Sequence, residues 1–96
     1  MKRPLFSVVI DNFNYGRFLG ECIESALGQS YRPLEVIVVD DGSTDHSAAV
    51  IAGFEGRIRH VTKPNGGQAS AFNAGLSLAE GEWVATWEPG PAQVPD

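Results

Sequence analysis

Two runs of apolar residues stand out in the hydrophobic pattern of the chain. Leu5–Ile10 and Val36–Val39 are rich in β-branched side chains, and each run ends at an acidic residue. A strand that is apolar on both faces belongs in the interior of a sheet that is covered on both sides. We therefore expect both runs to be central strands of a parallel sheet.

The segment between these runs has the periodicity of an amphipathic helix. Apolar pairs recur every four residues over positions 18–27, and Gly28 follows as the predicted C-cap. A strand, a helix and a strand of this length make a βαβ unit, whose crossover is almost always right-handed.

The same alternation continues along the chain. The polar segment Ser43–Asp45 offers caps for a second helix, which ends near Gly53. Arg57–Thr62 then alternates polar and apolar residues, as an edge strand does, and Trp83–Trp87 is predicted to be a fourth strand. The third helix lies between these two strands, and its predicted apolar stripe comprises Ala69, Phe72, Leu76 and Ala79.

These elements predict an α/β fold, a Rossmann-like three-layer sandwich. Its four-stranded sheet is expected to be mainly parallel, with the strand order 3-2-1-4. In that order the connections reverse beside the first strand, and open α/β sheets bind ligands at such a switch point, outside the carboxyl ends of the strands. Four polar segments would meet there, namely 11–14, 40–43, 63–67 and Glu88.

Composition and charge exclude several classes of protein. The chain has 96 residues, a net charge of −5 and only seven basic residues, and these are scattered, which argues against a nucleic-acid surface. The single cysteine, Cys22, excludes an internal disulfide and a cysteine-based zinc cluster. No segment approaches the roughly 18 apolar residues of a membrane span. We expect one domain in a cytoplasmic protein.

Three short motifs are candidates for chemistry, and each also has a purely structural explanation. Asp40 and Asp41 precede a glycine, so they can form a turn and a helix cap, or accept hydrogen bonds from a base or ribose, or hold a metal. Phe13 follows the first strand, either in a plain polar loop or as a face on which a nucleobase stacks. The segment 65–67 is either a turn or a set of backbone N–H groups for a phosphate.

Together these motifs resemble the opening of the family 2 glycosyltransferases. The resemblance lies in Ser7-Val-Val-Ile-Asp-Asn-Phe-Asn14, in Glu35-Val-Ile-Val-Val-Asp-Asp-Gly-Ser-Thr-Asp45 and in Asn65-Gly-Gly-Gln-Ala-Ser-Ala-Phe-Asn-Ala-Gly75. The motifs run from residue 5 to about residue 87 in the family's order and spacing. They imply the donor-binding half of a GT-A nucleotide-sugar transferase, with a UDP-sugar as the expected donor.

The resemblance also implies roles for individual residues. Phe13 matches the position that stacks near the uracil, Asp41 matches the carboxylate that accepts a hydrogen bond from the base, and Lys63–Gly67 matches the lining of the nucleotide pocket. The full set of expected nucleotide-sugar ligands is Asp11, Phe13, Asn14, Asp40, Asp41, Lys63, Gly66 and Gly67.

Three positions depart from the family's pattern. Asp11 stands where proline or threonine is usual, and Phe72 replaces an arginine. The family's Asp-x-Asp, which holds Mn²⁺ or Mg²⁺ against the diphosphate, falls on Glu88-Pro89-Gly90. Glu88 is then the one metal ligand left, and a single carboxylate is a poor site for a hard dication. No residue matches the family's catalytic base, so no catalytic residue is assigned.

Two other functions stay open at this point: a degenerate module that holds a nucleotide without turnover, and a receiver-type signalling domain. We expect residues 1–87 to form a truncated nucleotide-sugar-binding domain that is inactive in sugar transfer by itself, and residues 88–96 to form an irregular, proline-rich tail. The uncharged edge strand Trp83–Trp87 is open to pairing, which predicts a homodimer.

Overall fold

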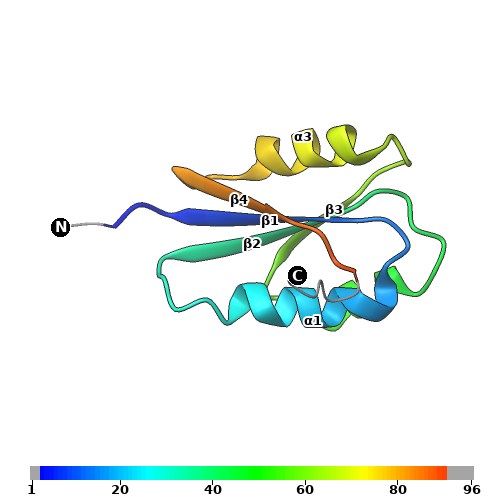
Figure 1. Cartoon of the computed structure of the whole chain (residues 1–96), viewed down its shortest axis with the longest axis horizontal. Coiled ribbons are helices and arrows are strands. Elements are labelled where there is room, and N and C mark those ends of the chain that lie inside the picture. The colour runs from blue at the N-terminus through cyan, green and yellow to red at the C-terminus, as the bar shows by residue number, and fades with distance from the viewer. Residues whose placement is uncertain (1–2, 91–96) are drawn as a thin grey trace, which may run out of the picture.

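Strands and helices alternate along the chain in a computed structural model that describes residues 3–90 (Figure 1). The elements are β1 (Phe6–Asn12), α1 (Gly16–Leu27), β2 (Leu34–Asp40), α2 (Ser47–Ala52), β3 (Arg59–Thr62), α3 (Gln68–Leu78) and β4 (Trp83–Trp87). The predicted elements are therefore confirmed, with boundaries that differ by a few residues. Gly28 is the C-cap of α1, as its position in the sequence predicts.

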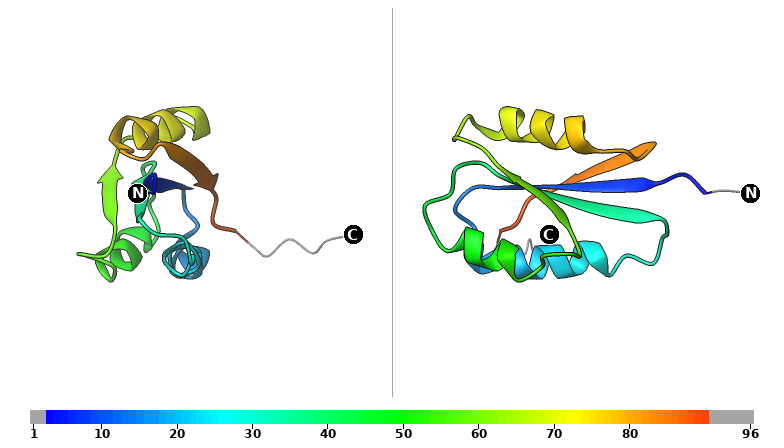
Figure 2. Two further views of the ribbon diagram at one scale, coloured as in Figure 1. Left: turned by 90° about the vertical axis from the view of Figure 1, so that its left-hand side faces the viewer. Right: turned by 180° about the vertical axis from the view of Figure 1, so that it is seen from behind.

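The four strands form one parallel sheet in the order β3-β2-β1-β4. Helices α1 and α2 cover one face, and α3 covers the other (Figure 2). The predicted three-layer sandwich and its strand order are confirmed. The central position of β1 and β2 follows from their apolar sequences, and the polar β3 lies at an edge.

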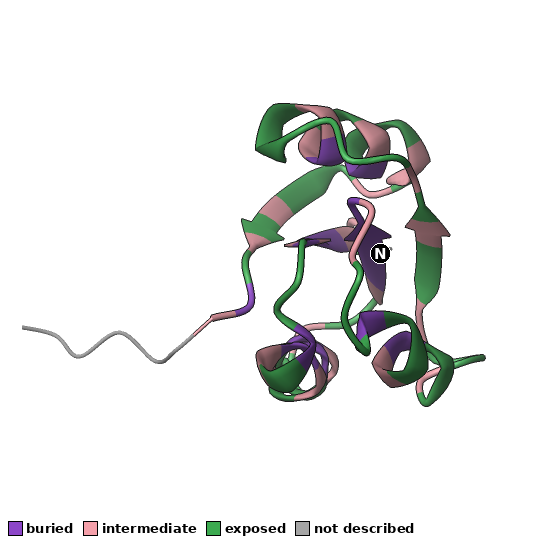
Figure 3. Ribbon diagram, turned by 90° about the vertical axis from the view of Figure 1, so that its right-hand side faces the viewer, coloured by how far each residue is buried: buried purple, intermediate pink, exposed green. Residues whose placement is uncertain are grey.

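The side chains of the central strands alternate between two hydrophobic cores. Val8 and Ile10 of β1 pack toward α1 and α2, whereas Val9 packs toward α3. All three side chains are fully buried. Burial falls off toward the edge strands and the outer faces of the helices (Figure 3).

The face that α3 turns to the sheet differs from the predicted stripe. Ala71 and Gly75 are buried against the sheet, while Phe72 is partly exposed and Leu76 is 38% exposed. A Cβ atom on Gly75 would lie 2.3 Å from Cγ1 of Val9. The helix therefore packs through its smallest residues, which a search for large apolar side chains misses.

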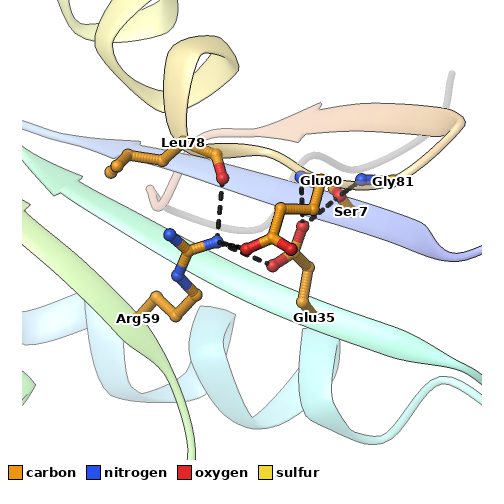
Figure 4. A network of polar contacts seen from close by, with 6 residues as sticks. All are labelled: Ser7, Glu35, Arg59, Leu78, Glu80 and Gly81. Carbon is orange, nitrogen blue, oxygen red and sulfur yellow. Dashed lines mark hydrogen bonds and ion pairs between the residues drawn. The ribbon is translucent and has the colours of Figure 1, made fainter.

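A polar network closes the amino-terminal end of the sheet on the α3 side (Figure 4). The carboxylate of Glu35 accepts hydrogen bonds from Ser7 Oγ (2.6 Å), from the backbone N–H of Glu80 (2.7 Å) and from Arg59 (3.0 Å). Arg59 also donates to the carbonyl of Leu78 (2.8 Å). These contacts lower the pKa of Glu35, although its burial acts in the opposite direction. The network fixes the α3–β4 connection against the first three strands.

In the part of the chain that the structure describes, no helix is both long and apolar enough to cross a membrane. Residues 88–90 of the predicted tail have no regular secondary structure. The remainder of that tail, residues 91–96, lies outside the described residues.

Candidate functional site

A cavity of about 240 Å³ lies at the carboxyl ends of β1 and β4, beside the start of α3. Its lining residues are Asp11, Phe13, Tyr15, Asp41, Asn65, Gly67, Gln68, Glu88 and Pro89. This is the end of the sheet that faces the viewer in Figure 3. The volume is below the roughly 300–1,000 Å³ of a pocket for a drug-sized molecule, so it suits one flat ring system better than a whole nucleotide sugar.

Three carboxylates line this cavity, and the alternation of side chains along a strand places Asp11 among them. Val9 packs under α3, and Asp11, two residues further along β1, belongs to the same face. Asp41 follows β2 and Glu88 follows β4, and both line the same cavity. The switch point therefore gathers negative charge on its α3 side.

Asp41 is buried, with 2% of its surface exposed, and its carboxylate accepts four hydrogen bonds. Oδ1 accepts from Lys63 Nζ (2.7 Å) and from the backbone N–H of Gly66 (3.0 Å). Oδ2 accepts from the backbone N–H of Gly67 (3.0 Å) and from Asn65 Nδ2 (3.3 Å). The bond from Lys63 is the main reason that the pKa of Asp41 lies below its usual value. Asp41 thus organises the loop that leads into α3.

Gly42 makes this arrangement possible. Its φ is +78°, and a Cβ atom there would lie 2.6 Å from the backbone nitrogen of Asn65. The turn after Asp41 and the loop 63–67 therefore approach each other more closely than any side chain would allow. The backbone N–H groups of Gly66 and Gly67, which the sequence offers to a phosphate, are directed at Asp41 instead.

Asp11 contrasts with Asp41. Within residues 3–90 its carboxylate has no hydrogen bond and no ion pair. Burial is the main reason that the pKa of Asp11 is raised to about 6; the charges of Glu88 and Asp41 add to this shift, and the charge of Lys63 partly opposes it. Asp11 is consequently an acceptor that lacks a donor.

Two aromatic rings border the cavity at its solvent side. Phe13 is 43% exposed and Tyr15 is 45% exposed. Tyr15 also packs against Phe18 of α1, with the ring centroids 6.1 Å apart. Exposed rings beside a cavity provide faces on which a base can stack.

Asp40 and Asn14, two of the residues expected to contact the ligand, do not line this cavity. Asp40 points to the opposite face of the sheet from Asp41, because neighbouring residues at the end of a strand alternate. Its Oδ1 accepts hydrogen bonds from Asn12 Nδ2 (3.0 Å) and Ser43 Oγ (2.5 Å). Asn14 has a φ of +56°, and its side-chain oxygen accepts from the backbone N–H of Thr44 (2.8 Å). Both residues hold the loops together.

The helix start at α2 is part of the same set of contacts. Asp45 accepts hydrogen bonds from the backbone N–H groups of Ser47 (2.9 Å) and Gly16 (2.9 Å), and so serves the first turns of both α2 and α1. Of the three predicted cap residues, Asp45 is the one that bonds to a helix N–H. The side-chain oxygen of the buried Asn12 has no hydrogen-bond partner among the described residues.

The remaining predicted residues divide into two groups. Asp11, Phe13, Asp41, Gly67 and Glu88 line the cavity. Lys63 and Gly66 do not line it, and each donates a hydrogen bond to Asp41 Oδ1.

Four lining residues were not among the predicted ligands: Tyr15, Asn65, Gln68 and Pro89. Tyr15 carries a signal that the sequence analysis missed, because it lies two residues after Phe13 in the same loop. Asn65 belongs to the segment 63–67 that the resemblance indicates, although it was not singled out. Gln68 and Pro89 carry no such signal.

The donor set at the cavity does not fit a divalent cation. Among residues 3–90, no group of three or more histidine, cysteine, aspartate or glutamate side chains is placed to hold a metal ion. At the family's metal motif, Glu88 supplies a carboxylate, whereas Pro89 and Gly90 supply no side-chain ligand. Hard cations such as Mg²⁺ need several oxygen ligands.

Comparison of the sequence with known proteins agrees with the family resemblance of its motifs. The family model described as Glycosyl transferase family 2 matches residues 7–88. Glycosyltransferase GlyG of Streptococcus pneumoniae is 44% identical over an alignment of 84 residues, and the match covers 83% of this chain and 28% of that protein. Chondroitin synthase of Pasteurella multocida is 40% identical over an alignment of 96 residues, and the match covers 97% of this chain and 10% of the synthase. The chain thus spans less than a third of the length of these relatives.

Solved structures agree in fold. TarS of S. aureus, in complex with UDP-GlcNAc, superimposes with a TM-score of 0.75 at 29% identity, over 86% of this chain and 26% of that one. The mannosyltransferase PcManGT of Pyrobaculum calidifontis, in complex with GDP-Man and Mn²⁺, gives a TM-score of 0.72 at 28% identity, over 88% of this chain and 27% of that one.

Proposed function

This chain belongs to glycosyl transferase family 2, and we propose that it supplies the donor-binding part of an enzyme that transfers a sugar to an acceptor hydroxyl. The observation that carries the proposal is the cavity at the carboxyl ends of β1 and β4, which combines two exposed aromatic rings with carboxylates. Family membership rules out the receiver-type alternative. A binding module without turnover remains the second candidate, because the matched residues include no catalytic base.

In this proposal the base of a nucleoside diphosphate sugar enters the cavity and stacks on Phe13 or Tyr15. Stacking on an aromatic side chain contributes about 1–3 kcal/mol per base. With one charge-assisted hydrogen bond, and after the entropic cost of association, this gives an affinity of about millimolar. Residues 1–87 form the binding domain, and the ligand residues come from the loops after β1 and β2 and from the loop 63–67.

The resemblance favours a UDP-sugar as the donor. TarS was solved with UDP-GlcNAc and PcManGT with GDP-Man and Mn²⁺, so both bases occur among structures with this fold. Because the residues at the cavity do not fit a divalent cation, we expect nucleotide binding by this chain to be largely independent of metal. We propose a cytoplasmic location for the protein, as the sequence predicts.

The proposal is tested by titrating the 96-residue chain with derivatives of UDP, GDP and dTDP, with and without Mn²⁺, while amide NMR signals are followed. Phe13→Ala should weaken the binding of every nucleotide. Trp83→Ala is the matched control, because Trp83 is also an exposed aromatic residue (55% exposed) and begins β4 at the end remote from the cavity. The proposal is wrong if no nucleotide shifts the signals of the cavity residues, or if both variants behave alike.

We further propose that the open edge of β4 mediates a two-fold dimer. Trp83 and Val84 are 55% and 39% exposed, and β4 pairs with a neighbour, β1, on one side alone within the described residues. An unpaired strand edge with little charge is prone to pair with another strand. Sedimentation at tens of micromolar tests this proposal, and a monomer at that concentration contradicts it.

A further inference from the structure

We propose that Asp11 reads the hydrogen-bonding edge of the donor base, and that the site prefers guanine to uracil. This inference rests on the proposed function, because it specifies which base enters the cavity. It differs from the UDP-sugar that the family resemblance predicts. Two of the carboxylates that line the cavity follow from neighbouring strands: Asp11 lies near the end of β1, and Asp41 comes directly after β2.

Asp41, the carboxylate that the resemblance assigns to the base, is already saturated. A carboxylate offers about four lone-pair positions, and Asp41 uses them for Lys63, Asn65, Gly66 and Gly67. A base that donates to Asp41 must first displace one of these donors. All four donors belong to the continuous loop 63–67, so the displacement would also disturb the start of α3.

Asp11 is the carboxylate that remains available. It lines the same cavity, and within the described residues no donor satisfies its two oxygens. Burial and the neighbouring negative charges of Glu88 and Asp41, which raise its pKa to about 6, leave it mostly ionised at neutral pH and short of stabilising contacts. A ligand whose hydrogen-bond donors point at Asp11 would satisfy its oxygens and also stabilise its negative charge.

The chemistry of the base edges then decides which base suits this site. An ionised carboxylate accepts hydrogen bonds and donates none, and it binds best to two parallel donors. Guanine presents such a pair, N1–H beside the 2-amino group. Uracil presents one N–H between two carbonyl oxygens, and one of these would face the second carboxylate oxygen. Adenine and cytosine each place an acceptor next to their amino group.

The charges around Asp11 favour the same base. The cavity lining includes Asp11, Asp41 and Glu88, and Lys63 is the neighbouring cation, already bound to Asp41. A surface with an excess of negative charge attracts the positive ends of N–H bonds and repels carbonyl oxygens. Phe13 and Tyr15 supply apolar ring faces for either base, so they do not distinguish the two.

The decisive experiment compares GDP, IDP and UDP as ligands of the 96-residue chain by NMR titration at neutral pH without metal. IDP is the matched ligand, because it lacks the 2-amino group of guanine and is otherwise identical to GDP. We expect GDP to bind about tenfold more tightly than IDP, as for the loss of one hydrogen bond to a charged group. UDP should bind more weakly than GDP by a similar factor or more.

Asp11→Asn should reduce the preference for GDP over IDP to about twofold or less, because an amide offers one acceptor in place of two. Glu21→Gln, which removes one negative charge from the exposed side of α1, should keep the preference. Equal binding of GDP and IDP, tighter binding of UDP, or an unchanged preference in Asp11→Asn overturns the inference and leaves nucleotide binding intact. Absence of binding by all three nucleotides overturns the proposed function and this inference with it.

Discussion

The contact between α3 and the sheet yields the sharpest prediction about stability. In Gly75→Ala, the new methyl group would lie 2.3 Å from Cγ1 of Val9 and 3.2 Å from Cγ2 of Val39. The shorter distance is about 1.2 Å less than the ~3.5 Å at which carbon atoms touch. Val9 is fully buried in a central strand, so the helix has to move outward.

Two opposing effects determine how much Gly75→Ala changes the free energy of unfolding. Alanine is better than glycine in a helix interior by about 1 kcal/mol, whereas overpacking a core costs about 1–3 kcal/mol. Because two side chains of the sheet are affected, we expect the upper part of that range and a net loss of about 2 kcal/mol. For a domain of this size, such a loss lowers the melting temperature by roughly 10 °C.

Gly20→Ala is the matched control, because it makes the same substitution inside α1. Its new methyl group would meet only Cγ1 of Val50, at an ordinary contact distance of 3.7 Å. This variant should gain up to about 1 kcal/mol from helix propensity. Urea unfolding followed by circular dichroism measures both variants, with two-state behaviour checked by a second probe.

A rescue experiment separates the close contact from other effects. Val9→Ala removes Cγ1, so Gly75→Ala should destabilise the Val9→Ala protein by less than it destabilises the wild type. The difference is the coupling energy of the two positions, for which neighbours in contact typically give about 0.5–3 kcal/mol. If Gly75→Ala is as stable as the wild type, or more stable, then close packing does not position α3 and our description of this interface is wrong.

Three further predictions concern the cavity. Asp11→Asn should raise the free energy of unfolding above pH 6, and this gain should disappear below about pH 4. The reason is that the folded state disfavours the charged form of Asp11 and so raises its pKa from 3.8 to about 6. A difference in stability that does not depend on pH would contradict this assignment. Asp41→Ala should cost about 2 kcal/mol of stability at neutral pH and remove most nucleotide binding, because the loop Lys63–Gly67 loses its common acceptor. An unchanged affinity for nucleotides would exclude this cavity as their binding site. The 96-residue chain should transfer no sugar from any nucleotide donor above a buffer blank, and measurable turnover would refute this.

The architecture was predictable because its signals are local. The two apolar runs identify β1 and β2 as central strands, and the polar β3 can lie only at an edge. The positions of Asp11, Phe13 and Asp41 at the cavity follow from the ends of these strands, because the carboxyl ends of parallel strands meet at one side of the sheet.

The details that could not be predicted depend on contacts between distant segments. Asp40 and Asp41 are adjacent in the sequence, which suggests a shared role, but their side chains lie on opposite faces of the sheet. The saturation of Asp41 arises from a loop more than twenty residues further along the chain. The buried face of α3 was misassigned because Gly75 contributes by its lack of a side chain.

The network around Glu35 lies at the opposite end of β1 from the cavity. Ser7 and Asp11 are four residues apart in β1, a separation of about 13 Å in an extended strand. Substitutions that far apart and without shared partners are generally additive in their effects on stability. The network around Glu35 can therefore keep one end of the sheet stable while the residues at the cavity change. In related domains the preference for a donor can then change during evolution without loss of the fold.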